Sequence, residues 1–324
     1  ETVFDLAGAW AALPMYTLGV ALMVYLSALL SVLFGQLLSA HPESTWSFLS
    51  LLAVPMLVRT ASSTLTATAA AVWSVAAAAT LFTAALLFGQ WLPLSLSGIW
   101  RFNVGGSDVL SLPHELIWAT LALALAYQSI RSPVSSVARP RGAVVGLMLI
   151  AMMMLVMAGL VLISPSLVAP EFRTDVPLPG LFPLLFLVIT GGAVSGVYAL
   201  IVTGPTVRQI QRQSDALVIS YGSIIIDGFL AALVLAVLCA GFTTADEWLS
   251  WYGLWPEQAG LYVWLDLVIL KMARFIGALR LPLHLAVGAV AALLAALALS
   301  MLDNLLRALA YSAEEVVEDF ELEP

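Results

Sequence analysis

Charged residues are scarce in this chain, and that scarcity excludes most soluble proteins. Asp, Glu, Lys and Arg make up 10% of the 324 residues, whereas soluble domains carry about 25%. Hydrophobic residues make up 62%, and the mean hydropathy is +1.03. Apolar stretches of about 20 residues recur, and the alternating segments of about ten residues that form a transmembrane barrel do not occur. The sequence therefore predicts an all-α, polytopic helical membrane protein.

Cysteine and histidine are also rare, which argues against most catalytic and metal chemistry. The single cysteine, Cys239, lies inside an apolar run, so no intrachain disulfide is possible, and we interpret it as a small buried hydrophobe. The three histidines, His41, His114 and His284, lie on separate segments, and no HExxH, GxSxG or phosphate-binding motif accompanies them. We therefore expect no enzyme activity, no metal, no cofactor and no nucleic-acid partner.

Eight apolar stretches have about the length that a membrane crossing requires. They cover residues 14–38, 64–92, 115–130, 142–164, 180–204, 215–241, 259–279 and 282–303. We expect a single transmembrane domain over 1–311, followed by an acidic tail over 312–324. A ninth stretch, 46–57, is too short to cross and is predicted to be re-entrant or interfacial, with Pro55 ending it.

Lys and Arg in short loops mark the cytoplasmic side of a membrane protein. With eight spans, four basic groups fall on that side: Arg59; Arg131, Arg139 and Arg141; Arg208 and Arg212; and Lys271, Arg274 and Arg280. The opposite side receives Glu171, Asp175, the Trp-rich stretch 245–257 and the acidic tail. Both termini are then expected outside. An outward start with neither an initiator Met nor a signal peptide predicts further spans upstream.

The fifth stretch carries weak helix formers near its middle: Gly191, Gly192, Ser195 and Gly196. Three interpretations compete, and one of them is tolerated irregularity without function. Small residues at this spacing let two membrane helices approach closely. Alternatively, they break the helix, so that unwound backbone lines a substrate or ion site, as in transporters with discontinuous helices.

Two further positions place charge inside apolar stretches. Asp227 lies near the middle of 215–241, where an isolated carboxylate costs several kcal/mol, so we expect it to be neutral or paired. A functional site and a structural pair both explain it. Asp303 and Arg307 are expected to form an i,i+4 pair near the outer end of the last span.

Several segments resemble the carbon starvation protein family of bacterial inner-membrane transporters. They are "GLFPLLFLVITGGAVSGVYALIVTGPTVRQI", "YGSIIIDGFLAAL" and "LRLPLHLAVGAVAALLAALALSMLDNLLRAL". The resemblance is firm over 179–241 and 279–309. It implies a fold related to amino-acid transporters, of which this chain holds a part. It also implies uptake of peptides or small carboxylates coupled to a cation gradient, in a multi-pass inner-membrane protein.

The same resemblance indicates candidate site residues and two alternative functions. The family's turn after its Gly-rich element is Thr203-Gly204-Pro205 here, and its usual Glu in the following helix is Asp227. Substrate or ion binding is then expected at Gly191, Gly192, Ser195, Gly196, Thr203 and Asp227. The alternative is a transport-inactive, transporter-derived subunit of a larger membrane complex. In both cases the partners are the lipid bilayer and other membrane subunits or upstream helices, and a transporter adds a small-molecule substrate.

Overall fold

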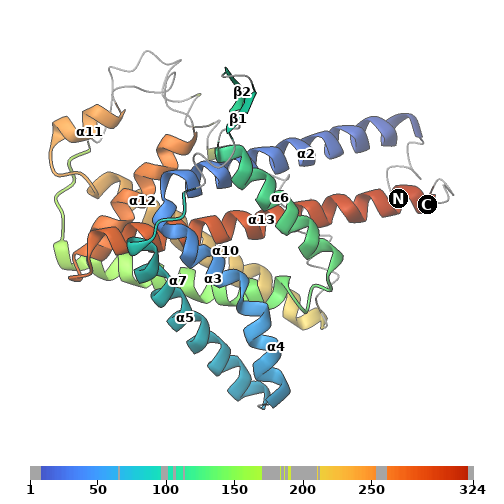
Figure 1. Cartoon of the computed structure of the whole chain (residues 1–324), viewed down its shortest axis with the longest axis horizontal. Coiled ribbons are helices and arrows are strands. Elements are labelled where there is room, and N and C mark those ends of the chain that lie inside the picture. The colour runs from blue at the N-terminus through green and yellow to red at the C-terminus, as the bar shows by residue number, and fades with distance from the viewer. Residues whose placement is uncertain are drawn as a thin grey trace. The chain divides into compact units, whose positions relative to one another are not determined.

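The computed structural model describes residues 9–64, 66–95, 101–104, 107–111, 114–169, 212–252 and 261–319, with isolated positions between 183 and 210. Helices dominate the described chain (Figure 1). The chain forms two compact units. One comprises Glu1–Ser27, Ala169–Ile224 and Asn304–Pro324, and the other Ala28–Val168 and Ile225–Asp303.

Helices cover seven of the eight expected ranges. They are α2 (Ala9–Ala40), α5 (Ala67–Trp91), α6 (His114–Arg131), α7 (Ala138–Ile163), α10 (Gln213–Ala240), α12 (Leu261–Gly277) and α13 (Leu283–Asp319). Five of the described helices, α2, α5, α7, α10 and α13, are long and apolar enough to cross a membrane. The predicted all-α, multi-pass fold class is therefore confirmed. The range 180–204 lies almost wholly outside the described residues, and the extent of the single domain stays a prediction.

The stretch around Pro55 differs from its predicted form. A short 3-10 turn, η1 (Pro42–Ser44), leads into α3 (Thr45–Leu52), and α4 (Val54–Thr64) begins after a break at Ala53. Pro55 therefore lies in the first turn of a new helix and does not end the structure. Proline is tolerated there because the first backbone N–H groups of a helix have no intrahelical acceptor. Since α5 packs against both α3 and α4, the pair forms a broken helix along α5.

The segment between α5 and α6 holds a feature that the sequence did not predict. Strands β1 (Arg101–Val104) and β2 (Ser107–Ser111) pair antiparallel, with an irregularity between Phe102 and Asn103. Strands this short add little stability alone, since isolated hairpins are marginal in water. The hairpin is a local addition to an otherwise helical fold.

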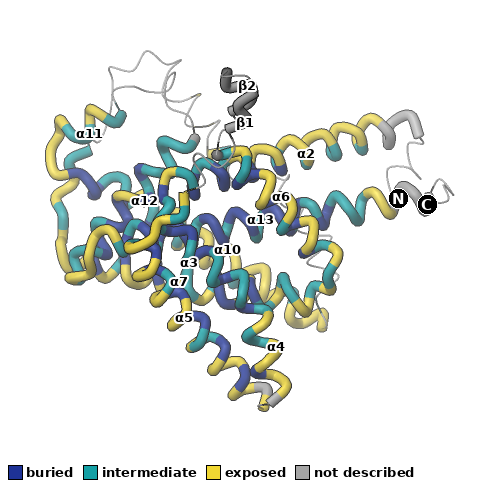
Figure 2. The backbone as a smooth tube through the Cα atoms, viewed as in Figure 1, coloured by how far each residue is buried: buried dark blue, intermediate teal, exposed yellow. Residues whose placement is uncertain are grey.

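In the second unit, the core is built around the first part of α13. Ala291, Ala292 and Ala295 are fully buried there, together with Val290. Figure 2 shows this part of α13 mainly in the buried and intermediate colours, whereas much of α10 is exposed. Alanine lets neighbouring backbones approach closely because its side chain is a single methyl group. In the first unit, the Tyr16 hydroxyl of α2 donates a hydrogen bond to the carbonyl of Ser312 on α13, at 3.3 Å.

The contact between α7 and α12 depends on a glycine. A Cβ atom at Gly159 of α7 would overlap the backbone carbonyl group of Phe275 on α12. The obstacle is backbone, so no flexible side chain can move aside. By contrast, a Cβ at Gly146, on the same helix, would meet nothing within 4 Å.

We predict that Gly159→Ala destabilises the protein. Separating α7 from α12 should lower the free energy of unfolding by about 1–3 kcal/mol, the usual cost of overpacking. Thermal unfolding of purified protein in detergent measures the change. Gly146→Ala is the matched control, and it should leave the midpoint unchanged or raise it slightly, since Ala favours helix. Equal midpoints for the two variants would contradict this account of the interface.

Candidate functional site

The sequence-predicted site residues divide into two groups. Gly191, Gly192, Ser195, Gly196 and Thr203 lie outside the described residues, so their roles stay predictions. Asp227 is described and lies midway along α10, where its side chain is exposed. A Cβ at either neighbouring glycine, Gly222 or Gly228, would meet nothing within 4 Å. This face of α10 is therefore open to lipid or to another helix, and whether Asp227 is neutral or paired stays a prediction.

A buried ion pair joins helices far apart in the sequence. The guanidinium of Arg141, in the first turn of α7, donates from Nη2 to Oδ2 of Asp303 on α13. Ser129 of α6 donates to the same carboxylate oxygen at 3.2 Å. Arg141 and Asp303 are only 4% and 2% exposed, so both charges have lost nearly all their hydration. Such a pair is stable only when its hydrogen bonds compensate for that loss.

This ion pair revises two sequence-based expectations. Asp303 was expected near the outer end of the last span and Arg141 in a cytoplasmic loop, but the two side chains are in contact. The assignment to opposite sides is therefore wrong for one of them. Arg307 lies one turn further along α13 and is also buried. Its pairing with Asp303 stays a prediction, to be tested by exchanging the two charges.

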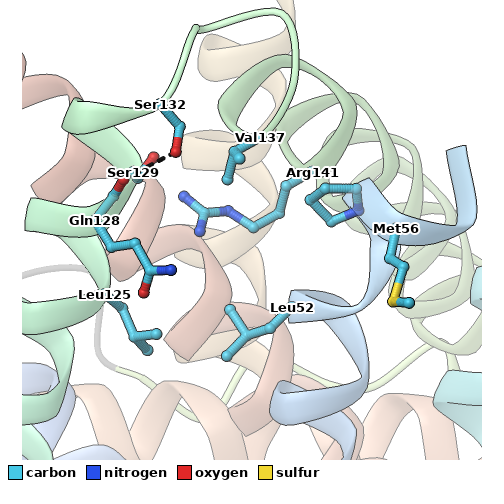
Figure 3. A pocket seen from close by; sticks show the side chains of 9 residues that line it. Leu52, Met56, Leu125, Gln128, Ser129, Ser132, Val137 and Arg141 are labelled. Carbon is cyan, nitrogen blue, oxygen red and sulfur yellow. Dashed lines mark hydrogen bonds between the residues drawn. The ribbon is translucent and has the colours of Figure 1, made fainter. Parts of the chain in front are cut away.

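Beside the ion pair lies a cavity of about 250 Å³, which we call the Arg141 cavity. Its lining comes from α3, α4, α6, α7 and the turn between α6 and α7: Leu52, Pro55, Met56, Leu125, Gln128, Ser129, Ser132, Val137 and Arg141. Figure 3 shows the Arg141 guanidinium pointing across the cavity toward Ser129 and Gln128. Leu52 and Leu125 form an apolar wall, and the exposed side chains of Met56 and Gln128 mark the rim.

The polar end of the Arg141 cavity has spare hydrogen-bonding capacity. Among the described residues, Nε of Arg141 and Oδ1 of Asp303 are buried without a hydrogen-bond partner. Ser132 donates to the carbonyl of Gln128 at 3.1 Å, which fixes the turn at the cavity edge. A buried donor without an acceptor is unfavourable by about 1–3 kcal/mol. Neither Nε nor Oδ1 is accessible from the cavity, so the ion pair must open before a ligand reaches them.

A second polar cluster surrounds His41, which follows α2. Its Nδ1 lies 3.4 Å from Oε1 of Glu43, and its Nε2 lies 3.0 Å from Oδ1 of Asp266 on α12. Only the protonated imidazolium can donate to both carboxylates at once. Burial lowers the pKa of His41, but the hydrogen bonds and charges of Glu43 and Asp266 together outweigh it and raise the pKa above its ordinary value. Burial acts to raise the pKa of Glu43, and the hydrogen bond with His41 and its other contacts lower it on balance.

A third cluster fixes the helix α11 (Ala245–Tyr252) against α12. Lys271 donates to Oε1 of Glu247 at 2.6 Å, and Arg274 donates to the carbonyl of Gly241 at 2.5 Å. The hydrogen bond from Lys271, with those from the backbone and hydroxyl of Thr243, lowers the pKa of Glu247 to about 2. The sequence placed Lys271 and the stretch 245–257 on opposite sides of the membrane. Their contact shows that this assignment is also wrong for one partner.

Comparison with known proteins assigns the family. A family model described as carbon starvation protein CstA matches residues 4–249, which is most of the chain. The chain belongs to the carbon starvation protein family. The matched range extends further toward the N-terminus than the segments on which the resemblance was firm, and it does not include 279–309.

Individual relatives match over shorter stretches. A Peptide transporter CstA of Campylobacter jejuni is 32% identical over 131 residues, covering 37% of this chain and 18% of the relative. A Peptide transporter CstA of Helicobacter pylori is 26% identical over 165 residues, covering 48% and 22%. The Pyruvate/proton symporter BtsT of Escherichia coli is 30% identical over 141 residues, covering 38% and 20%. The matched stretches thus span about a fifth of each relative. No solved structure matches the chain.

The His41 cluster predicts a pH-dependent stability. Because the folded pKa of His41 lies above its ordinary 6.5, the cluster contributes fully below pH 6.5, and this contribution is lost as the pH rises through the folded pKa. Because the folded pKa of Glu43 is lowered, Glu43 contributes stability above pH 4.5, and this contribution is lost as the pH falls through the folded pKa. The thermal midpoint should therefore fall as the pH rises above 6.5.

His41→Gln should remove this alkaline decline, because the neutral amide does not titrate. His284→Gln is the matched control, since His284 is exposed at the start of α13. It should retain the decline. Thermal unfolding midpoints measured below and above pH 6.5 test this prediction. If His41→Gln keeps the wild-type fall of the midpoint, another group causes the fall.

Proposed function

We propose that the protein to which this chain belongs is a secondary transporter that takes up peptides or small carboxylates, coupled to a cation gradient. The family match over 4–249 carries the proposal. Relatives of this family are named as a peptide transporter and as a pyruvate/proton symporter, and both kinds of cargo carry a carboxylate. The five long apolar helices supply the membrane-crossing framework that such a carrier needs.

We place the ion or substrate site of this transporter at Asp227 and at Gly191, Gly192, Ser195, Gly196 and Thr203. The middle position of Asp227 in a 28-residue apolar helix supports its part in the site. An ionisable residue at that depth is costly, and in membrane proteins such residues mark ion and proton pathways. The bacterial inner membrane is the proposed location.

The exposed face of α10 supports a further part of the proposal, which is contact with other membrane helices. Ile224, Ile225 and Tyr221 are more than 60% exposed there, in the same region as Asp227. Lipid tolerates the apolar side chains but not an isolated carboxylate. Covering Asp227 therefore requires a neighbouring helix, either from the remainder of a longer protein or from another subunit.

Uptake of labelled pyruvate and of labelled dialanine by cells that lack their own carriers tests the function. We expect Asp227→Asn to abolish coupled uptake of the transported compound while leaving expression and thermal midpoint unchanged, because the amide cannot carry a proton or pair with a cation. Asp215→Asn is the matched control, since Asp215 is exposed in the first turn of the same helix. It should transport normally.

Two outcomes would contradict the proposal in different ways. Full uptake by Asp227→Asn would remove Asp227 from the site and leave the transport function standing. No uptake of either compound by the wild-type protein, at normal expression in the membrane, would overturn the function and favour the transport-inactive subunit.

A further inference from the structure

We propose that the Arg141 cavity is a binding site for a carboxylate group, with the Arg141 guanidinium as its anchor and Asp303 as an internal competitor for that anchor. The inference deepens the proposed transport function and rests on it for its physiological role. The site is formed by α3, α4, α6 and α7, and Asp303 reaches its polar end from α13.

Arg141 has more N–H donors than Asp303 uses. A guanidinium has five N–H donors in a planar fork that matches the two oxygens of a carboxylate. Asp303 accepts from Nη2, and the guanidinium lines the cavity and points across it (Figure 3). N–H groups that Asp303 does not take can therefore donate to a ligand carboxylate in the cavity, whereas Nε is fully buried and is not reached from it. The hydroxyls of Ser129 and Ser132 lie in the same lining.

The net charge of the buried groups determines how an anion can bind beside Arg141. Arg141 and Asp303 together are neutral, so a ligand anion that simply joined them would add a net negative charge at a buried place, which is costly. The ligand carboxylate therefore competes with Asp303 for Arg141, and Asp303 must lose its charge or its contact for tight binding. The groups that contact Asp303 are Arg141 from α7 and Ser129 from α6. A weaker interaction of Asp303 with Arg141 should therefore raise the affinity of the cavity for the ligand carboxylate.

The size and lining of the Arg141 cavity limit the ligand to a small molecule with an apolar part. A volume of about 250 Å³ lies just below the range of about 300–1,000 Å³ that is typical of sites for drug-sized ligands. The apolar wall consists of Leu52 and Leu125 (Figure 3). The site therefore suits a carboxylate that carries a short apolar substituent. A free short-chain acid and the carboxyl end of a small peptide both have this chemistry.

Equilibrium binding to the purified full-length protein in lipid nanodiscs tests the site. Propionate is the probe, and propionamide, which has nearly the same shape without the charge, is its control. Propionate should bind and propionamide should not. Dialanine is a separate arm: binding of dialanine in competition with propionate assigns the site to peptide carboxyl ends as well, and propionate binding alone assigns it to short-chain acids.

Substitutions at the ion pair then separate an anchor from a purely structural pair. Arg141→Gln should weaken propionate binding at least about tenfold, since a charge-assisted hydrogen bond is lost. Arg139→Gln, an exposed position on the same helix, should bind as the wild type does. Asp303→Asn should bind propionate about tenfold more tightly, because the competitor has lost its charge. A structural pair predicts no such gain, so equal or weaker binding by folded Asp303→Asn would overturn the competition.

A cavity-filling substitution covers the case in which loss of a buried charge prevents folding. Leu125→Trp fills the cavity from α6 and leaves the ion pair intact, so it should abolish propionate binding. Leu121→Trp, one turn earlier on α6 and outside the lining, should bind normally. Propionate binding at wild-type affinity by Leu125→Trp, or equal binding of propionamide, would overturn the site. If uptake also persists in Leu125→Trp, the transport function stands without this cavity. Binding without uptake by the wild type keeps the site and overturns the transport function.

Discussion

The ion pair between Arg141 and Asp303, with the hydroxyl of Ser129, joins three helices, α6, α7 and α13. Through Ser129 it fixes the end of α6, through Arg141 the start of α7, and through Asp303 the register of α13. Removing one partner of such a pair leaves an uncompensated buried charge, which costs about 3–5 kcal/mol. The ion pair therefore fixes how α6, α7 and α13 meet inside a largely apolar core.

The cavity beside this pair follows from the same constraint. Arg141 must reach inward from the first turn of α7, and the turn 132–137 must return from α6 at that level. The break at Ala53 brings the start of α4 to the same place, so Pro55 and Met56 complete the lining. A helix break, a turn and a buried cation thus meet at one point. Each alone is common, and together they form a small site with one charged end and one apolar end.

The sequence predicted the helices well and the polar contacts poorly, for a physical reason. Apolar length is a local property, so α2, α5, α7 and α13 could be recognised from runs of hydrophobic residues. The partner of Arg141 is 162 residues away, and no local pattern links the two positions. Counting basic residues treated Arg141 as a loop charge and Lys271 as part of the basic group at the end of a span, although both side chains are buried against carboxylates.

Some local signals could have corrected these expectations. Pro140 is compatible with the first turn of a helix, which places Arg141 inside α7 and not before it. Pro55 is likewise compatible with a first turn, and α4 begins at the place where Pro55 was expected to end the stretch 46–57. For the predicted site, Asp227 was found by its depth in an apolar run, and the other predicted site residues lie outside the described residues.

The alanine-rich packing of α13 has a consequence for motion. Methyl groups present a nearly smooth surface to neighbouring helices, so Ala291, Ala292 and Ala295 offer few ridges that would resist sliding along the helix axis. Sliding of packed helices past one another is one of the two common modes by which proteins rearrange. On such a surface the ion pair of Asp303 with Arg141 fixes the position of α13 along its axis. A ligand or proton that broke this ion pair would allow the whole helix to shift along its axis.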